Sequence, residues 1–458
     1  MKLKGHSPVD LIINNRKLIE KIYIVLVIFS LICVPMVGIN YDLTKYLPDS
    51  SPSAQALDIM EDEFTYPGMG RVMLEDVTLY EAKNIKDRIA DVDDVDMVMW
   101  CDMATNIYGS SEFINYDNID DYYKDNTAYM DVIFTDKDSS NQTHKAVHEI
   151  ENIVGDKGLV AGSAVSDTNL GPTINKEVAR VMALAVVIIY IILTITTTSW
   201  FEPVLFLSVL GIAILINMGT NIIFGEISFL SNAVGAVLQL ACSMDYSIFL
   251  LNSFEENKKR FPDDKERAMG HAIANTFKSV AGSSVTTVAG FLALCVMTFA
   301  LGRDLGIVMA KGVVMGVLCC VTLLPSLVLV FDKWIEKTTH RPLFSNMNKP
   351  SEFITKHYAV WIVLFLVLLF PAIYGNNHTK IYYNIAQSLP GSLDSNVANE
   401  KLEKDFEMGN MHMILMDKNM DGVQKQKMLD QVDEVDGVKW TISMNSLIGP
   451  SVPDSMIP

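Results

Sequence analysis

The feature that most constrains this 458-residue chain is a set of seven long apolar segments. A transmembrane helix needs about 20 predominantly apolar residues to cross about 30 Å of hydrocarbon. Segments of this kind lie at residues 20–39, 178–198, 204–224, 227–251, 280–301, 305–331 and 358–374. The first is too long for the apolar part of a signal peptide, and no small-residue cleavage site follows it. The sequence therefore predicts a polytopic α-helical membrane protein.

Lysine and arginine residues gather before the first segment, after the fourth and before the seventh. These stretches share one side of the membrane if every segment spans it, and positive charge marks the cytoplasmic side. We therefore expect a cytoplasmic N-terminus, a cytoplasmic loop at residues 253–276 and a cytoplasmic linker at residues 333–357. Within the loop, residues 255–275 are typical of a basic helix lying along the membrane surface.

A polar region at residues 40–175 separates the first two segments. It carries 27 acidic and 9 basic side chains. The excess of 18 negative charges in this region equals the net charge of −18 of the whole chain. An acidic surface argues against nucleic acid as a partner. The pattern predicts strands at 71–75, 95–100, 128–134 and 159–164 and helices at 79–92 and 143–154. Two successive βαβ units predict an exterior α+β domain of the ferredoxin-like type.

Part of the sequence is repeated. YDLTKYLPDS follows the first segment and YNIAQSLPGS follows the seventh, with their matching residues 342 positions apart. The matches are Tyr41 with Tyr383, Leu47 with Leu389, Pro48 with Pro390 and Ser50 with Ser392, and at the same offset Pro35 with Pro371 and Phe64 with Phe406. Further on, VDMVMW ending at Trp100 resembles VDGVKW ending at Trp440. Several matches in the same order, each after an apolar segment, indicate an internal repeat.

Repeats of this kind build many transporters, with the working site between the repeats. We expect a cytoplasmic N-terminus and first helix (1–39), an exterior porter domain (40–175), a five-helix bundle (176–332), the linker (333–357), a seventh helix (358–376) and the start of a second porter domain (377–458). On this plan the second copy ends inside its exterior domain at Pro458, and a complete protein has twelve helices and two exterior domains.

A carboxylate lies in the fourth segment, QLACSMDYSIFLLNSFEE, where Asp245 is flanked by apolar residues. A charge at the centre of a membrane helix costs about 2.5–3.5 kcal/mol on insertion scales, and such residues are usually functional, often as proton sites. Tyr246 can donate or accept a hydrogen bond. Adjacent helix positions do not share a face, so we expect the two side chains to contact different partners. The alternative is that Asp245 only ties helices together by a hydrogen bond.

Further polar residues in the apolar segments are candidates for supporting a proton relay: Ser283, Ser284, Thr286, Thr287 and Lys311. Hydroxyl side chains in membrane helices more often bond their own backbone or a neighbouring helix. Lys311 is either a counter-charge in the relay or a side chain that reaches the membrane surface. Gly312 and Gly316 form a GxxxG pattern, which favours close helix packing.

The motifs of common enzyme classes do not stand out in this sequence. It shows no P-loop, nucleophile motif, pair of catalytic carboxylates or metal-binding cluster, so we expect no enzymatic activity, no cofactor and no metal. The six cysteines form no disulfide framework, since five lie in apolar segments and Cys101 stands alone in the polar region.

The stretch from DYSIFLLNSFEE through RAMGHAIANTFKSVAGSSVTTVAGFLAL resembles the MmpL branch of the resistance–nodulation–division superfamily. YDLTKYLPDSSPSAQALDIMEDEF and TLLPSLVLVFD are similar to this branch as well, so the resemblance covers nearly the whole chain. It implies a proton-translocating pair at Asp245 and Tyr246. One departure is Ser243, where the branch usually has glycine, and we expect the packing of small residues to survive it.

The resemblance also implies a protein of a bacterial plasma membrane that uses the proton gradient to export lipids or other hydrophobic or amphipathic compounds, including drugs. Monomers and trimers both occur on this plan. Two alternatives stay open, an accessory membrane subunit of protein secretion and a non-transporting, sterol-sensing-like membrane protein. The presence of Asp245 favours a transporter over a sensor.

Overall fold

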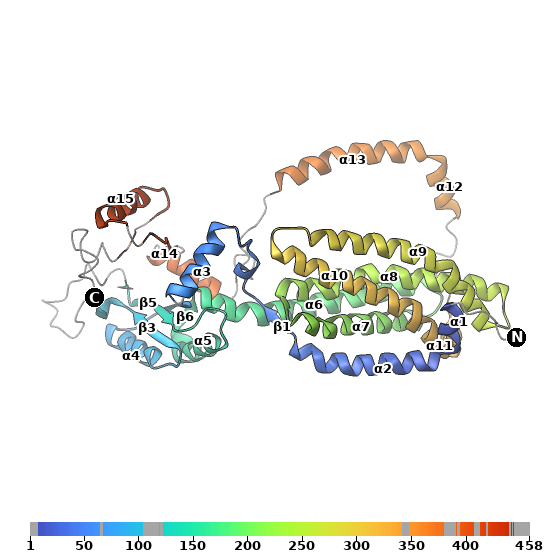
Figure 1. Cartoon of the computed structure of the whole chain (residues 1–458), viewed down its shortest axis with the longest axis horizontal. Coiled ribbons are helices and arrows are strands. Elements are labelled where there is room, and N and C mark those ends of the chain that lie inside the picture. Colours follow the sequence, from blue (N-terminus) through green and yellow to red (C-terminus); the bar gives the residue numbers. More distant parts are fainter. Residues whose placement is uncertain are drawn as a thin grey trace. The chain divides into compact units, whose positions relative to one another are not determined.

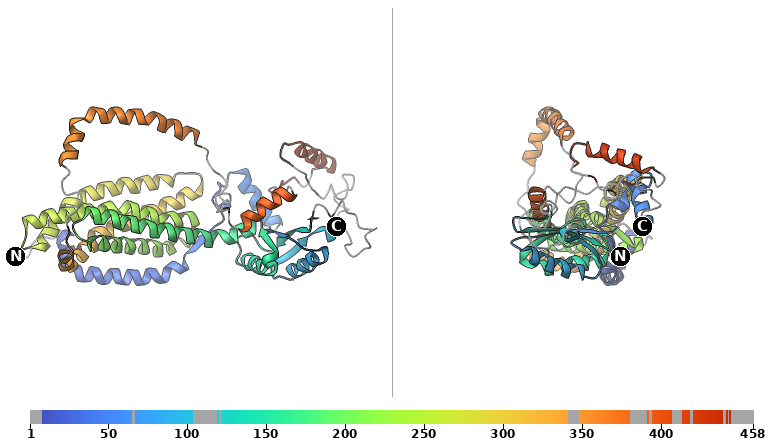
Figure 2. Two further views of the ribbon diagram at one scale, coloured as in Figure 1. Left: turned by 180° about the vertical axis from the view of Figure 1, so that it is seen from behind. Right: turned by 90° about the vertical axis from the view of Figure 1, so that its left-hand side faces the viewer.

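The computed structural model describes residues 8–64, 67–103, 119, 122–340, 348–379, 391, 394–406, 413–417, 420–438, 441 and 443. The chain divides into two compact units, residues 1–401 and residues 402–458. The first unit contains a bundle of long helices and an α/β domain, both visible in Figures 1 and 2.

Seven helices among the described residues are long and apolar enough to cross a membrane. They are α2 (Arg16–Cys33), α6 (Ser163–Thr196), α7 (Glu202–Thr220), α8 (Phe229–Arg260), α9 (Lys265–Leu294), α10 (Ala300–Leu318) with its continuation α11 (Leu324–Lys337), and α13 (Tyr358–His378). Each overlaps one of the seven predicted segments, which confirms a multi-helix membrane architecture.

The predicted surface helix at residues 255–275 is wrong. Helix α8 continues to Arg260 and α9 begins at Lys265, so the predicted loop at 253–276 consists of two helix ends and a short turn. Asp264 caps α9 by accepting from the backbone N–H of Arg267 at 2.9 Å. A hydropathy scale detects only the apolar part of a helix, whereas the backbone hydrogen bonds of α8 and α9 continue beyond that part.

Two other predicted boundaries also fall inside helices. Helix α6 runs without interruption from Ser163 to Thr196, across the boundary expected at residue 175. Helix α11 extends to Lys337, into the linker expected from residue 333. A short helix α1 (Pro8–Asn14) precedes α2, and α12 (Asn348–Lys356) precedes α13.

The α/β domain (described residues between 67 and 162) contains an antiparallel sheet. Strand β2 (Met69–Leu74) pairs with β5 (Thr127–Phe134) and β6 (Gly158–Ala161), and β3 (Val95–Met99) pairs with β5, which gives the order β3-β5-β2-β6. Strand β4 (Tyr123–Lys124) extends β5 as a short hairpin. Helices α4 (Leu79–Ala90) and α5 (Asn141–Val154) lie on one face of the sheet (Figure 1).

Local signals fix the ends of these helices. The Thr78 hydroxyl accepts from the backbone N–H of Glu81 at 3.3 Å, and the Glu81 carboxylate accepts from the backbone N–H of Thr78 at 3.0 Å. This capping box satisfies two donors at the start of α4. The Ser140 hydroxyl caps α5 by accepting from the backbone N–H groups of Gln142 and Thr143, each at 3.2 Å. Gly155 ends this helix at a φ of 52°, which glycine adopts without steric cost.

The core of the α/β domain lies between the sheet and its two helices. Alternate residues of β5, from Ala128 through Met130 and Val132 to Phe134, point into this core, as β-strand geometry requires. Trp100 follows β3 and is 2% exposed in the same cluster. This side of the sheet is thus stabilised by the burial of large apolar side chains.

A parallel pair of short strands connects the polar region with the start of α8. Strand β1 (Gly38–Asn40) pairs with β7 (Glu226–Ser228), so the chain leaving α2 lies beside the chain entering α8. Tyr41 then stacks on Phe229 with ring centroids 5.7 Å apart. Gly171 of α6 approaches the same tyrosine so closely that a Cβ there would lie 2.8 Å from the ring.

Helix α8 packs along α10 through a regular row of small and polar side chains, here called the α8–α10 seam. Its facing pairs are Ser231 with Asp304, Gly235 with Val308, Gln239 with Gly312, Ser243 with Gly316 and Ser247 with Cys320. Successive members lie four residues apart on each helix, and every pair has the same separation of 73 in the sequence. Such rows form the ridges by which helices pack.

A π-helical turn at Cys319–Leu323 joins α10 to α11. A turn of this kind accommodates one extra residue in a helix and is often found at functional sites. Beyond it, Lys258 of α8 meets Asp332 of α11 at 3.0 Å, and this pair is 74 residues apart. The π turn thus absorbs one extra residue, and α8 stays in contact with α11 beyond it.

Most of the predicted repeat signature of the second copy lies outside the described residues, namely Tyr383, Leu389, Pro390, Ser392 and Trp440. The structure does describe α14 (Asp394–Phe406) and, in the second unit, α15 (Gly422–Asp433). Helix α3 (Pro52–Phe64) has the same length as α14 and begins 342 residues earlier. The repeat itself stays a prediction at this point.

Candidate functional site

Asp245 and Tyr246 lie near the middle of α8 and point to different faces. The Asp245 side chain is exposed on the surface of the bundle. Tyr246 is 4% exposed and packs in the bundle core with Leu250 and Leu251. The two residues therefore have separate surroundings, as their adjacent positions in a helix require.

Asp245 forms no hydrogen bond or ion pair with any of the residues that the structure describes. Apolar side chains surround it on its own helix, with Phe249 exposed one turn further on. A carboxylate on an apolar helix surface is costly in hydrocarbon unless it binds a proton or meets a polar partner. Within the described part of the chain, the Asp245 carboxylate thus stands unpaired on a largely apolar helix surface.

The hydroxyl residues of α9 bond their own helix. Ser284 donates to the carbonyl of Val280 at 2.6 Å, and Thr286 and Thr287 donate to the carbonyl of Ser283 at 2.7 and 3.0 Å. Ser283 itself is exposed. No hydrogen bond described in the structure joins these four residues to Asp245, so it does not bring the predicted support group together with the carboxylate.

Lys311 caps the end of α7. Its Nζ donates to the carbonyl of Asn217 and to Thr220 Oγ1, each at 2.9 Å, and to Asn221 Oδ1 at 2.6 Å. A cation at a helix C-terminus is stabilised by the helix dipole and by unpaired carbonyl groups. Seam spacing places Lys311 level with residue 238, about 10 Å from Asp245 along α8 at 1.5 Å per residue. The structure thus gives Lys311 a capping role.

Glycines of α10 bring it close to α8 and α7. A Cβ at Gly316 would lie 2.2 Å from Ser243 Oγ, and one at Gly312 would lie 2.8 Å from Asn217 Nδ2. The predicted GxxxG packing is therefore present at both positions. Ser243 is completely buried, so the departure from glycine at this position is accommodated by the glycine that faces it.

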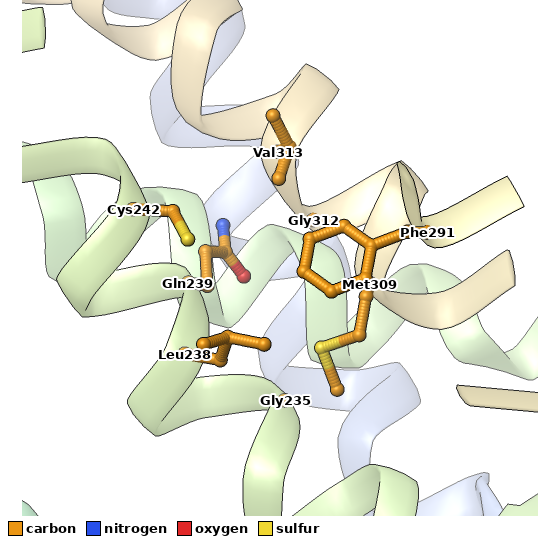
Figure 3. A pocket seen from close by; sticks show the side chains of 8 residues that line it. All are labelled: Gly235, Leu238, Gln239, Cys242, Phe291, Met309, Gly312 and Val313. Carbon is orange, nitrogen blue, oxygen red and sulfur yellow. The ribbon is translucent and has the colours of Figure 1, made fainter. Parts of the chain in front are cut away.

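A narrow crevice lies between α8, α9 and α10 (Figure 3). Its lining residues are Gly235, Leu238, Gln239, Cys242, Phe291, Met309, Gly312 and Val313. Figure 3 shows the side-chain amide of Gln239 among these mostly apolar groups. The crevice has no room for a water molecule in this structure.

Comparison with known proteins identifies the family of this chain. The family model described as "MMPL family" matches residues 45–361, which is more than half of the chain and includes the whole of α6 to α11. The chain belongs to the MMPL family. The resemblance read from the residues around Asp245 is thereby confirmed at the level of the family.

Curated relatives of this MMPL chain are transport and membrane proteins by name. "Putative membrane protein ActII-3" of Streptomyces coelicolor is 27% identical over 40% of this chain and 26% of its own length. "Probable transport protein MmpL2" of Mycobacterium tuberculosis is 25% identical over 45% of this chain and 22% of its own length. "Siderophore exporter MmpL5" of the same species is 26% identical over 45% and 23%. The chain thus matches about a quarter of the length of these relatives.

Among solved structures, the MMPL chain resembles "Crystal structure of SecDF in Super-membrane-facing form". The TM-score is 0.36 with 12% sequence identity, over 71% of this chain and 39% of that chain.

The bundle of this MMPL chain contains a buried polar pair that was not predicted from the sequence. Asn217 of α7 donates to Gln239 of α8 at 3.0 Å, and both residues are 3% exposed. The signal was available, because Ser231, Gln239 and Ser243 recur at multiples of four residues on one face of α8. These side chains are neutral, whereas a charge within an apolar segment marks only Asp245 and Lys311 as candidates.

Proposed function

We propose that this MMPL chain is part of a transporter of a bacterial plasma membrane that uses the proton gradient to export lipids or other hydrophobic or amphipathic compounds. The observation that carries the proposal is Asp245, an exposed carboxylate at mid-span of α8 with no ion pair or hydrogen bond to the described residues. Membership of the family and relatives named as transport proteins and exporters support it.

In this proposal Asp245 binds a proton arriving from the side of higher proton concentration and releases it to the other side. Protonation removes a charge from the apolar surface of α8, so each step changes the cost of exposing that surface to hydrocarbon. Tyr246 acts on a different face of α8, where it couples the helix to the packed core. Ser283, Ser284, Thr286 and Thr287 have no direct role in the transfer.

The architecture that we propose is a repeated one. Helix α2 begins at Arg16 and α13 at Tyr358, a separation of 342 residues, and α3 and α14 are separated by the same number. Helices α4 and α15 both have 12 residues and begin 343 residues apart. These spacings support two copies of one plan, with the α/β domain as a ferredoxin-like porter domain on the exterior side.

The assignment of sides also belongs to this proposal. The N-terminus and the α8–α9 turn carry clustered lysine and arginine residues, which favours the cytoplasm for both. The acidic α/β domain then faces the exterior. The assembly is a monomer or a trimer, with a bilayer and a hydrophobic substrate as its partners.

The test is proton-coupled efflux by the protein that carries this chain, reconstituted in vesicles with a pH-sensitive dye. The probes are ethidium and a fluorescent phosphatidylethanolamine. Asp245→Asn is expected to lower substrate-dependent proton flux and efflux by at least a hundredfold, with insertion unchanged, because the amide cannot carry the proton. Asn252→Leu, at an exposed position on the same helix, is the matched control. Full efflux by Asp245→Asn would overturn the proposed function.

A further inference from the structure

Two exposed tryptophan side chains lie at one end of the helix bundle. Trp200 stands just before α7 and is 55% exposed, and Trp334 stands near the end of α11 and is 61% exposed. Each adjoins the end of an apolar stretch of its helix. Tryptophan is enriched where hydrocarbon meets lipid headgroups, because its ring is apolar and its N–H group is polar. This end of the bundle therefore presents aromatic rings at headgroup level.

The two tryptophans belong to one surface that folding assembles from distant segments. The backbone N–H of Trp200 donates to the carbonyl of Thr338 at 3.2 Å. The hydroxyl groups of Ser199 and Thr338, 139 residues apart in the sequence, bond each other at 2.7 Å. Phe201, the next residue after Trp200, packs on Trp334 with ring centroids 5.9 Å apart. These contacts hold the turn before α7 against the end of α11.

Two lysines lie beside Trp334 on α11. Lys333 and Lys337 are exposed and four residues apart, so they are neighbours on the helix surface, and Lys337 is also three residues beyond Trp334. Neither lysine forms an ion pair or hydrogen bond with any residue that the structure describes. Their positive charges are therefore available to a ligand.

The acidic neighbours of these two lysines are already paired with other helices. Asp332 accepts hydrogen bonds from Lys258 of α8, at 3.0 Å, and from Lys265 of α9. Glu336 accepts from the same two lysines, each at 3.0 Å. Two carboxylates and two ammonium groups balance, so this ion cluster has no net charge. The positive charge beside Trp334 thus remains uncompensated within the described part of the chain.

We propose that Trp200, Trp334, Lys333 and Lys337, here called the aromatic–basic patch, bind an anionic phospholipid of the leaflet at this end of the bundle. The ammonium groups contact the headgroup phosphate, and the indole rings pack on the upper part of the acyl chains. A zwitterionic headgroup carries a cation that opposes the lysines, so it binds less tightly. The patch holds a lipid at the protein surface, and the proposal does not rest on the proposed export.

The test is native mass spectrometry of the full protein that carries this chain, titrated with phosphatidylglycerol and phosphatidylcholine of identical acyl chains. Lys333→Gln combined with Lys337→Gln is expected to weaken phosphatidylglycerol binding about tenfold, because two attractive charges are lost. Binding of phosphatidylcholine should be unchanged. Lys333→Arg combined with Lys337→Arg keeps both charges and should keep the affinity for phosphatidylglycerol.

The matched control removes two other exposed lysines from the same end of the bundle. Lys259 precedes the α8–α9 turn, and Lys17 follows Arg16, which pairs with Glu266 just after that turn at 2.7 Å. Lys17→Gln combined with Lys259→Gln makes the same change of net charge and should leave phosphatidylglycerol binding unchanged. An equal loss in this control would mean diffuse attraction to a basic surface and would overturn the patch.

A second measurement asks whether lipid reaches the aromatic rings. The fluorescence that is lost in Trp334→Phe should be quenched more strongly by brominated phosphatidylglycerol than by brominated phosphatidylcholine. Lys333→Gln combined with Lys337→Gln should remove this difference. Equal quenching by both lipids in the unsubstituted protein, or unchanged phosphatidylglycerol binding without the two lysines, would overturn the proposal. Neither result touches the proposed function, whose test is efflux by Asp245→Asn.

Discussion

The α/β domain and the α8–α10 seam are both well packed, but they bury different kinds of side chain. The α/β domain buries Trp100, Met130 and Phe134 between its sheet and helices. The seam buries glycine, serine and amide side chains, with Gly316 against Ser243. In water, apolar area removed from solvent drives packing at about 25 cal/mol per Å². In hydrocarbon this force is missing between helices, so close backbone approach and hydrogen bonds take its place.

This difference means that the same kind of substitution has opposite consequences in the two regions. Removing volume should damage the α/β domain, whereas adding volume should damage the seam. Polar groups in the seam are left partly unpaired, while the α/β domain satisfies its helix ends by caps such as Thr78. The two regions therefore also differ in how their buried polar groups are satisfied.

The largest effect on stability is expected from Phe134→Ala. Phe134 is 1% exposed in the α/β core, and truncating a buried phenylalanine costs about 3–5 kcal/mol. Hydrogen–deuterium exchange of peptides covering β2 and β5 should report this loss, with no change in α8 or α10. Phe277→Ala, at an exposed position of α9, should change neither region. If the sheet of the variant kept the exchange protection of the unsubstituted protein, burial of the Phe134 side chain would not be what stabilises this core.

The second effect is expected from Gly316→Ala, which adds volume to the seam. Its Cβ would lie 2.2 Å from Ser243 Oγ, and overpacking of this kind costs about 1–3 kcal/mol. The midpoint of thermal unfolding in detergent should fall. Adding Ser243→Gly removes the clashing hydroxyl and should restore most of the loss.

Gly282→Ala is the matched control for the seam, since a Cβ at Gly282 has nothing within 4 Å. Equal losses from Gly316→Ala and Gly282→Ala would mean that glycine acts there through the backbone and that the close approach of α8 and α10 is irrelevant. Failure of Ser243→Gly to rescue would point to the same conclusion.

A smaller effect is expected from Thr78→Ala, which removes the cap of α4 at a cost of about 1 kcal/mol. Hydrogen bonds from Thr78 lower the pKa of Glu81. The stability that this carboxylate contributes is thus present above its ordinary pKa and is lost as the pH falls through the lowered value. Exchange at the start of α4 should rise in the variant, and its dependence on acid pH should weaken. An unchanged pH dependence would mean that the Thr78 hydroxyl does not contribute to it, because the backbone N–H of residue 78 still donates to the Glu81 carboxylate in the variant.

The smallest effect is expected from Asp131→Asn. Burial raises the pKa of Asp131 above its ordinary value, although the Tyr129 hydroxyl and Arg71, 3.6 Å away, favour the ionised form. Its stabilising contribution is therefore complete below an ordinary aspartate pKa and is lost as the pH rises through the raised value. Asp131→Asn should flatten this part of the pH profile of β5 protection, corrected for intrinsic exchange. If the pH profile of β5 protection kept its slope in Asp131→Asn, the slope would arise from another titrating side chain.

The sequence by itself determined the membrane class, the seven helices and the order β2-α4-β3-β5-α5-β6 within the α/β domain, but it did not predict helix α3 or the short strand β4. Hydrophobic length and periodicity are properties of local stretches, so they can be read without knowing which elements meet. The same local reading placed Asp245 and Tyr246 on different faces of one helix. It failed at the α8–α9 turn, because polar helix ends resemble a loop on a hydropathy scale.

Only the tertiary structure decided what the polar side chains of the bundle contact. Lys311 was a candidate counter-charge, and the structure shows it capping α7 instead, because the end of α7 packs beside α10. Gln239 was not predicted as a site residue from the sequence, yet it accepts a hydrogen bond from Asn217 of another helix, beside Gly312. Helix partners and their register depend on contacts between distant segments, and a pattern within one segment carries no information about them.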